Sequence, residues 1–296
     1  MKLLYFLGLV LGACNASAQT YSNVTETKTD SNTLLWEISG NGLTAPSYLF
    51  GTFHLLCKDD IHFSEALKQA VSTSKEVYLE LDMDDPSTIM GAFMLMNMKN
   101  GKRLKDLYTP EQYKRVSDFF KDSLKTPLGM FQTMKPEFLI ALLYPKMMPC
   151  NTTASIEESI MQLAKANKKE IKGLETMAFQ ASVFDSIPYE KQATELLQTI
   201  DSMEHSKKYF SQMITAYLEQ RLDKIERIIN NPEFGSTENQ DILLDNRNRN
   251  WIGQLKGIMK NGAVFVAVGA GHLVGEAGLI ALLRAEGYTV KGVENR

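Results

Sequence analysis

Two motifs of the same form, a glycine followed three positions later by a histidine, lie near opposite ends of this chain. They are Gly51-Thr52-Phe53-His54 and Gly269-Ala270-Gly271-His272, and they contain two of the four histidines. Each motif follows an apolar run typical of a β-strand. Parallel strands of one sheet end at a common edge, where α/β proteins usually place their sites. We therefore expect His54 and His272 to meet there, as general bases or metal ligands.

Two acidic residues stand at the ends of other expected strands. Glu80 lies in the stretch 77–82, and Glu175 closes the stretch 170–175. Two imidazoles with one or two carboxylates form a donor set that suits a divalent transition metal, such as Mn, Co, Zn or Fe. Two alternatives stay open. Glu80 alternates with leucines and could face solvent, and Glu175 could begin the next helix as an acid favoured by the helix dipole.

One arginine also has the properties of a site residue. Arg247 lies in a polar segment, residues 247–251, inside a stretch with the apolar spacing of a helix. Its planar guanidinium can bind a substrate carboxylate through two hydrogen bonds or stabilise a developing oxyanion. The alternative is a salt bridge on the surface of that helix, which would contribute little to stability.

The composition is that of a globular protein able to bury a large core. The chain has 296 residues, of which 44% are hydrophobic, and its formal net charge is -3. Such a charge gives no basic footprint of the kind that binds nucleic acid. We therefore expect no nucleic-acid partner, and the sequence has no polybasic patch for a membrane surface.

Residues 1–18 have the pattern of an export signal. They combine a positive Lys2, an apolar stretch at 3–13 and a cleavage site of the A-x-A type at 16–18. The apolar stretch is too short to span a bilayer as a mature helix. A competing lipoprotein pattern would leave Cys14 as a lipid-bearing N-terminus, but the A-x-A site is the better match.

The export signal sets the expected location of the mature protein. We expect it to be periplasmic or secreted, with a flexible lead-in at residues 19–32 and no transmembrane segment later in the chain. Cleavage after residue 18 leaves two cysteines, Cys57 and Cys150. An even pair in an oxidising compartment favours a disulfide, although two buried free thiols are the alternative. A bridge would anchor the loop that carries His54.

The order of the expected elements favours an α/β fold. Residues 47–50, 64–74 and 77–82 have the patterns of a strand, a helix and a strand, which is typical of parallel winding. The continuous apolar run 263–268 is typical of a central parallel strand, and an edge strand follows at 288–293. We expect a central sheet that is mostly parallel or mixed.

The middle of the chain is expected to be helical. From about residue 86 to 250 the pattern is that of helices, with two of them over 189–230, interrupted by the strand at 170–175. A further helix is expected at about 274–286. The sequence therefore predicts a single domain, residues 33–296, in which a large helical insertion at about 86–250 forms a cap.

Several motifs together resemble the TraB/GumN family, which also includes PrgY and the Tiki proteins. The resemblance covers almost the whole mature chain and rests on these segments: 35–38 with the hairpin into the first glycine–histidine motif, 79–82, 173–176, Arg247-Asn248 ahead of Trp251, 266–273, and 278–288. The stretch 78–89, YLELDMDDPSTI, is similar to the Tiki branch in particular.

The resemblance implies a fold and a chemistry. The fold would be related to the erythromycin-esterase and ChaN-like α/β group, and the activity would be that of a metallopeptidase acting on peptides or secreted proteins. His54, His272 and Glu80 would then hold the metal. Glu175 would support a ligand or act as a general base, and Arg247 would hold the substrate or its oxyanion.

Two other functions are compatible with the same resemblance. Some branches of the family are linked to peptide pheromones, which suggests a protein that binds and sequesters a peptide without cleaving it. In the esterase-like group a histidine can act as the base without a metal, so His54 could serve a metal-free hydrolase.

Overall fold

The computed structural model describes residues 32–85, 91, 94–231 and 239–296. The export signal, Cys14 and nearly all of the lead-in lie outside these residues. Within the described part, no helix combines the length and apolar character needed to cross a membrane.

The core of the fold is a six-stranded, mostly parallel sheet in the order β6-β4-β7-β2-β1-β8. Its strands are β1 (Leu35–Ser39), β2 (Ser47–Thr52), β4 (Glu76–Leu81), β6 (Glu170–Glu175), β7 (Val264–Gly269) and β8 (Thr289–Val293). The first four strands in this order run parallel, and β1 is antiparallel to both of its neighbours. The expected α/β class and mostly parallel sheet are confirmed.

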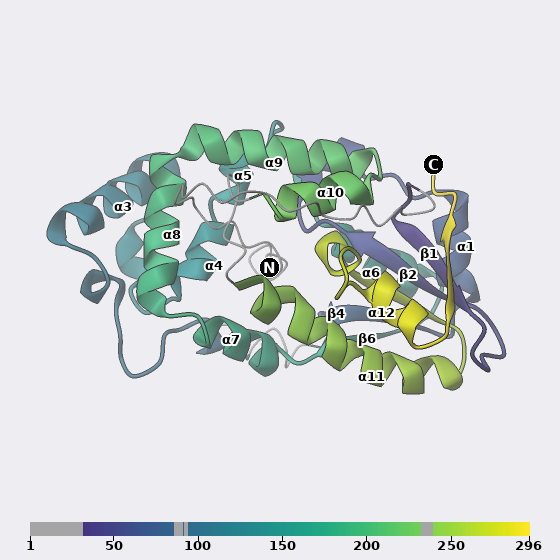
Figure 1. The fold of residues 1–296 in the computed structure, drawn as a ribbon. Helices are drawn as coiled ribbons and strands as arrows, with labels where there is room; N and C mark the ends of the chain where they lie inside the picture. The colour runs from purple at the N-terminus through teal and green to yellow at the C-terminus, as the bar shows by residue number, and fades with distance from the viewer. Residues whose placement is uncertain (1–31, 86–90, 92–93, 232–238) are drawn as a thin grey trace, which may run out of the picture.

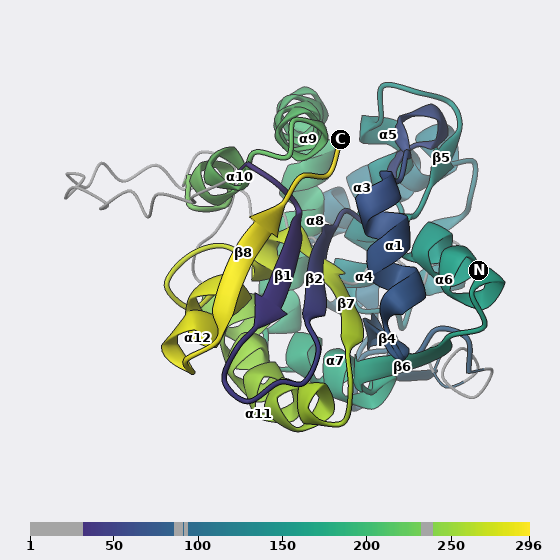
Figure 2. The same ribbon diagram turned by 90° about the vertical axis from the view of Figure 1, so that its right-hand side faces the viewer.

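Helices pack against both faces of this sheet and also extend away from it (Figures 1 and 2). The α-helices are α1 (Glu65–Thr73), α3 (Pro110–Ser123), α4 (Pro136–Ala141), α5 (Tyr144–Met147), α6 (Ile156–Ala166), α7 (Met177–Asp185), α8 (Tyr189–Asp201), α9 (Met203–Leu218), α10 (Leu222–Ile229), α11 (Asn246–Lys260) and α12 (Leu279–Ala285). In Figure 2, α1 and α6 lie on one side of the sheet, and α11 and α12 on the other. The helices α3, α4 and α8 form a lobe beyond the sheet, from which α9 leads back (Figure 1).

Local sequence accounts for the elements that position the site. All but the last residue of β7 are buried, as its apolar run predicts for a central strand covered on both faces. Helix α1 begins where the Ser64 side chain accepts a hydrogen bond from the backbone N–H of Leu67, an N-terminal cap. The strand at 170–175 is observed as β6, at one edge of the sheet.

Two helix predictions need correction. The region 189–230 forms three helices, not two, because helical winding is interrupted twice: at Ser202, whose φ and ψ are −111° and 36°, and at Gln220, whose φ is +57°. The helix expected from about residue 274 begins only at Leu279. The preceding segment contains Gly275, with φ of +82°, a left-handed conformation that ends regular winding. In addition, α6 and β6 belong to the sheet layers, so only part of the stretch 86–250 forms the helical lobe.

A small second sheet joins two distant parts of the chain. Strand β3 (Leu56–Cys57) pairs with β5 (Thr153–Ala154). Beside this pair, a disulfide links Cys57 to Cys150, as the cysteine pattern predicts. The disulfide fixes the chain just after His54 against the chain just before α6.

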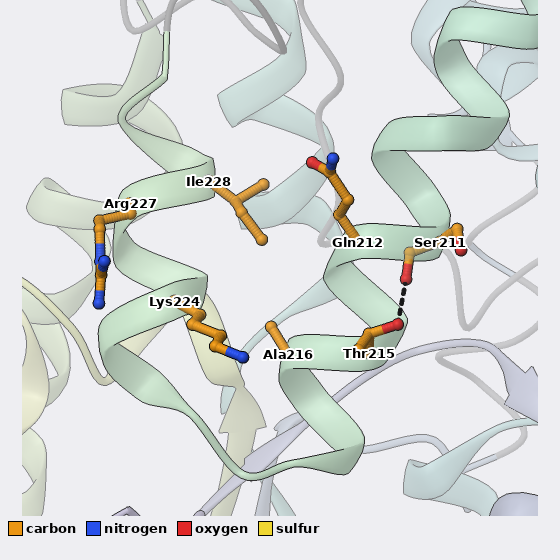
Figure 3. Close-up of a pocket in the computed structure, with 7 residues that line it drawn as sticks. All are labelled: Ser211, Gln212, Thr215, Ala216, Lys224, Arg227 and Ile228. Atoms are coloured by element: carbon orange, nitrogen blue, oxygen red, sulfur yellow. Dashed lines mark hydrogen bonds between the residues drawn. The ribbon is translucent and has the colours of Figure 1, made fainter.

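A surface cavity of about 350 Å³ lies between α9 and α10 (Figure 3). It is lined by Ser211, Gln212, Thr215, Ala216, Lys224, Arg227 and Ile228. Its two cationic groups are already paired, Lys224 with Glu219 and Arg227 with Asp223. The cavity therefore presents no uncompensated charge that would select an ionic ligand.

Candidate functional site

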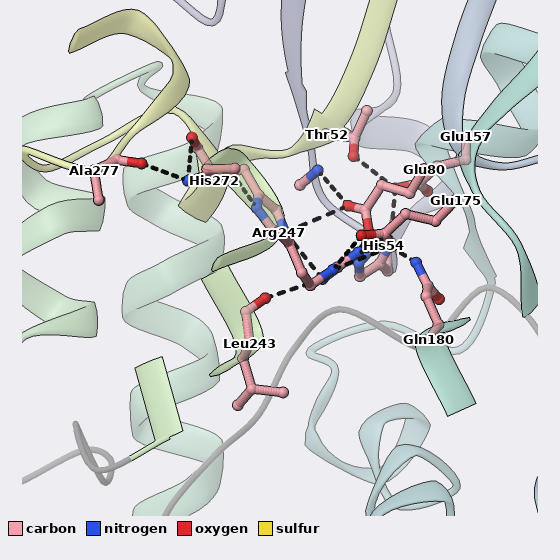
Figure 4. Close-up of polar contacts among 12 residues, drawn as sticks. Thr52, His54, Glu80, Glu157, Glu175, Gln180, Leu243, Arg247, His272 and Ala277 are labelled. Atoms are coloured by element: carbon pink, nitrogen blue, oxygen red, sulfur yellow. Dashed lines mark hydrogen bonds and ion pairs between the residues drawn. The ribbon is translucent and has the colours of Figure 1, made fainter. Parts of the chain in front are cut away.

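The strand order brings the predicted site residues together. In the order β6-β4-β7-β2, the carboxyl ends carry Glu175, Glu80, His272 and His54 in turn. Arg247 reaches the same place from α11, and Figure 4 shows these side chains directed toward one another. Their burial excludes the surface alternatives: the side chains of Glu80, Glu175 and Arg247 are only 11%, 3% and 5% exposed.

The two glycine–histidine motifs pack directly on each other. Strands β2 and β7 are parallel neighbours, with Gly51 opposite Val268. A Cβ atom at Gly51 would lie 3.2 Å from Ala270 and 3.1 Å from the Leu273 side chain, so only glycine allows this approach without displacement. In each motif the histidine therefore lies just beyond the end of its strand, and both histidines belong to the same cluster of buried side chains.

His54 is paired with a carboxylate that the sequence did not indicate. Its Nδ1 lies 2.7 Å from Oε1 of Glu157, in the first turn of α6. The Glu157 carboxylate also accepts hydrogen bonds from Thr52 Oγ1 and from Ser155 Oγ, each at 2.6 Å. Three donors therefore hold this buried carboxylate in one orientation.

The charges around His54 favour its protonated form. Burial alone would lower the pKa of His54, but the Glu157 carboxylate and its hydrogen bond, with a smaller contribution from Glu80, raise it above its ordinary value. Burial likewise opposes the charge on Glu157, yet His54 and the two hydroxyl donors lower the pKa of that carboxyl. Nε2 of His54 is buried and has no hydrogen-bond partner among the described residues.

Arg247 occupies the centre of the cluster, and all five of its N–H donors are used. Nε lies 3.1 Å from both Glu175 oxygens, and Nη2 lies 2.6 Å from Glu80 Oε2 and 2.9 Å from Glu175 Oε2. Nη1 contacts the Leu243 carbonyl at 3.0 Å and His272 Nε2 at 3.2 Å. A contact between Arg247 and a substrate would therefore require one of these bonds to break.

The hydrogen bonds of Asn248 determine the tautomer of His272. The amide group of Asn248 donates to the carbonyls of His272 and Ala277, at 3.3 and 2.8 Å, so its oxygen is the acceptor that faces His272 Nδ1 at 2.7 Å. Nδ1 then carries the hydrogen, and Nε2 is left with a lone pair that accepts from Arg247. The ring of Trp251 packs against both His272 and Arg247.

His272 is neutral and Glu80 is ionised, although both side chains are buried. Burial and the neighbouring Arg247 lower the pKa of His272 to about 3, so this imidazole is neutral at physiological pH. Burial would raise the pKa of Glu80, but Arg247, both histidines and the backbone N–H of Gly269 hold it well below its ordinary value. Glu175 differs, because burial outweighs Arg247 and raises its pKa.

Gly269 shows how closely these groups surround one point. A Cβ atom there would lie 3.4 Å from Glu80 Oε1, 3.7 Å from His272 Cδ2 and 3.9 Å from His54 Nε2. The backbone N–H of Gly269 also donates to Glu80 Oε1 at 2.9 Å. A side chain at this position would intrude among the three groups. This explains why the second motif begins with a glycine.

Comparison with known proteins identifies the family. The model of the TraB/PrgY/gumN family matches residues 34–292. The chain belongs to this family. The site residues all lie within the matched region. No solved structure gave a significant match to the chain.

Curated relatives match a smaller part of the chain. Metalloprotease TIKI1 of Danio rerio is 34% identical over 113 residues, which are 38% of this chain and 21% of that protein. Metalloprotease TIKI2 of Danio rerio is 35% identical over 88 residues, or 29% of this chain and 17% of that protein. Metalloprotease TIKI2 of Xenopus tropicalis is 33% identical over 88 residues, or 29% and 16%. The matched segments span about a fifth of these relatives or less.

The structure allows a test of the expected metal site at His54, His272 and Glu80. Both imidazoles are anchored through Nδ1 by an oxygen acceptor, as ligand histidines usually are, and His54 Nε2 has no partner in the described part. However, Arg247 donates hydrogen bonds to both His272 Nε2 and Glu80 Oε2, so these two atoms are not available as ligands. Among the described residues, no three His, Cys, Asp or Glu side chains are grouped closely enough to hold a metal ion. In this arrangement the residues do not fit a metal, which would have to displace Arg247.

Sequence reasoning missed the partners that orient the two imidazoles. Glu157 lies three positions before Ile160 in a segment predicted only as a helix, where an acid in the first turn is ordinarily attributed to the helix dipole. Asn248 was visible as part of the motif with Arg247 but had no predicted role. The available signal was a pair of hydroxyl residues: Thr52 lies inside the His54 motif, and Ser155 immediately precedes α6.

Proposed function

We propose that this protein is a hydrolase that cleaves peptide bonds, with His54 as its general base. The observation that carries the proposal is the His54–Glu157 pair: Nδ1 is fixed by a carboxylate 2.7 Å away, while Nε2 is buried and has no partner in the described part. A base held in this way is typical of hydrolytic sites. Membership of a family with curated relatives named metalloproteases supports peptides or proteins as the substrate class.

The charges of the site suit proton transfer by His54. Nε2 would take a proton from a water molecule as that water attacks the substrate carbonyl, and would later return the proton to the leaving amine. The imidazolium formed in between would be stabilised by Glu157 on one side and Glu80 on the other, because both carboxylates raise the pKa of His54. Arg247 keeps Glu80 ionised and thereby maintains this stabilisation.

The oxyanion of the reaction would need a donor from Arg247. Its six contacts are to carboxylate oxygens, to His272 Nε2 and to the Leu243 carbonyl, and that carbonyl is the only uncharged oxygen among them. Hydrogen bonds to carboxylates are stronger than those to neutral acceptors. The bond from Nη1 to Leu243 O is therefore the one we propose to exchange for the substrate.

A metal-dependent peptidase is the second candidate. It is favoured by the free Nε2 of His54 and by the anchoring of both imidazoles through Nδ1. It requires Arg247 to release His272 and Glu80, so that these side chains become available. Mn, Co, Zn and Fe are the ions to test, because imidazole and carboxylate ligands suit all of them.

Peptide cleavage tests the proposal. Wild-type protein, His54→Gln and the buried but distant Val116→Ala would be incubated with a complex peptide mixture, and new termini identified by mass spectrometry. We expect cleavage by wild type and Val116→Ala, and a loss of at least about a hundredfold in His54→Gln. Equal cleavage by His54→Gln would refute the proposal. Peptides that stay intact and bind wild type stoichiometrically would also refute it, and would favour peptide sequestration.

Metal removal separates the two candidates. The same assay after dialysis against a chelator, and after addition of each ion, should leave the rate unchanged if His54 acts without metal. Loss of activity on chelation, recovery with one ion and retention of that ion by wild type but not by His54→Gln would establish the metal-dependent form.

We also propose that the protein is exported. The support is the N-terminal signal pattern together with the Cys57–Cys150 disulfide, since disulfides persist mainly in oxidising compartments. N-terminal analysis of the protein recovered from cells tests this directly. A terminus at Gln19 would establish cleavage after Ala18, an acylated Cys14 would establish the lipoprotein, and an uncleaved chain in the cytosol would refute export.

A further inference from the structure

The disulfide lies at the base of the His54–Glu157 pair. On one side, His54 is followed by β3 and Cys57; on the other, Cys150 is followed by β5 and the start of α6, which carries Glu157. Strands β3 and β5 pair with each other, and the backbone N–H of Lys58 donates to the Thr152 carbonyl at 3.0 Å. The two short segments that deliver the imidazole and its carboxylate are thus joined side by side.

The strand pairing that joins these segments is short, although Phe53, Leu56 and Ile156 also pack in the core. Strand β3 pairs with β5 through only two residue pairs, Leu56 with Ala154 and Cys57 with Thr153. A pair of strands this short is not stable in water without additional support. The disulfide supplies such support, because it ties together positions that are 93 residues apart in the chain.

The pair also demands accurate placement. An active group must be held within about 0.5 Å of its productive position by the residues around it. The hydroxyls of Thr52 and Ser155 orient the Glu157 carboxylate, but they come one from each of the two segments. If the segments shift apart, the hydroxyls shift with them and the imidazole loses its partner.

We propose that the Cys57–Cys150 disulfide is a positioning element for the His54–Glu157 pair, and that breaking it separates imidazole from carboxylate while the fold survives. Cys150 is partly exposed, so a thiol reagent can reach the bond. A dithiol reductant would be oxidised to its own disulfide, and Cys57 and Cys150 would each be left as a protonated thiol. The loss of catalysis that should follow rests on the proposed function; the loss of the contact does not.

The test is the nuclear magnetic resonance signal of the Nδ1–H protons. Wild type should show a slowly exchanging Nδ1–H signal from His54, assigned by its absence in His54→Gln. The second such signal, from His272 bonded to Asn248, is an internal control because its partner lies on α11, away from the disulfide. In the Cys57→Ser/Cys150→Ser variant and in reduced wild type, we expect the His54 signal to disappear or shift and the His272 signal to remain.

Two comparisons separate positioning from simple loss of stability. Val116→Ala, which leaves a cavity in the helical lobe, should lower the melting temperature and leave both signals in place. A second disulfide-free variant, Cys57→Ala/Cys150→Val, replaces the bridge with apolar groups and should behave like the serine variant. If every disulfide-free form unfolds, or if the His54 signal stays unchanged in a folded one, the inference is wrong.

Turnover supplies the catalytic part of the test. On a peptide that wild type cleaves, folded disulfide-free protein should lose kcat by about tenfold or more, with little change in KM, because the base and not the binding surface is affected. Unchanged kcat would overturn the catalytic role of the bridge. If wild type cleaves nothing, the proposed function fails, while the two Nδ1–H signals still decide whether the disulfide positions the pair.

Discussion

Nδ1 of His54 and Oε1 of Glu157 lie 2.7 Å apart, although a long segment of the chain separates the two residues. This segment begins at β3, contains the helices that precede β5, and ends where β5 pairs with β3. The hydroxyls of Thr52 and Ser155 donate to the same carboxylate and so favour the orientation in which Glu157 faces His54. The fold therefore positions the two side chains as a pair.

The first prediction concerns the pH dependence of hydrolysis. His54 must be neutral to accept a proton, so kcat/KM should rise with pH through its pKa, which Glu157 raises above the ordinary value of 6.5. Glu157→Gln removes the negative charge, so the acid limb of the pH profile should move to lower pH, and the rate on the plateau should fall by about tenfold or more. Rates measured on one peptide from pH 5 to 9 check both effects.

A neighbouring residue provides the control for that experiment. Glu158 lies on the same turn of α6, and its backbone N–H bonds to Ser155, but its side chain has no contact with His54 among the described residues. Glu158→Gln should leave the pH profile where it is. A shift of equal size in both variants would show that the net charge of the helix, and not the contact with His54, sets the profile.

The sequence predicted which strand-end residues meet at the site better than it predicted the hydrogen bonds and ion pairs among them. Strand-end positions indicated that His54, Glu80, Glu175 and His272 would meet, because parallel strands share an edge. The mutual geometry was not accessible, since no local pattern shows that Arg247 bonds to two carboxylates at once. Glu157 was missed for a related reason: its partner is determined by the pairing of β3 with β5, a contact between distant segments that neither segment reveals alone.

The second prediction concerns the tautomer of His272. Asn248→Ala removes the acceptor at Nδ1, so the ring is free to place its hydrogen on Nε2, where it would oppose Arg247. Hydrolysis should fall by about tenfold or more, and the nitrogen signals of His272 should show a mixture of tautomers. The control is Asn250→Ala, an exposed residue of the same helix, which should change neither. A single unchanged tautomer in Asn248→Ala would contradict the assignment.

The third prediction concerns the buried charge cluster. Arg247→Met would leave Glu80 and Glu175 close together without their cation, and removing one side of a buried ion pair typically costs about 3–5 kcal/mol of unfolding free energy. The loss should shrink as pH falls and the carboxyls take up protons. Adding Glu80→Gln and Glu175→Gln should restore part of the stability. Denaturant unfolding at pH 5 and pH 7.5 measures these differences, and a loss that does not depend on pH would point to packing instead.

The last prediction concerns Glu137, a carboxyl buried in α4 beside Glu195 of α8 and the phenol of Tyr144. Burial, with a contribution from the charge of Glu195, raises its pKa from the ordinary 4.5 to about 8. The folded state therefore keeps the proton between about pH 4.5 and pH 8 while the unfolded state releases it. The resulting stability is fully present below pH 4.5 and is lost as pH rises to about 8, by at most about 1.4 kcal/mol per pH unit. Glu137→Gln should remove this dependence, whereas Glu65→Gln, on the exposed side of α1, should retain it. Unfolding free energies at pH 5, 6, 7 and 8 decide the matter, because parallel curves for wild type and Glu137→Gln would show that this carboxyl does not hold its proton.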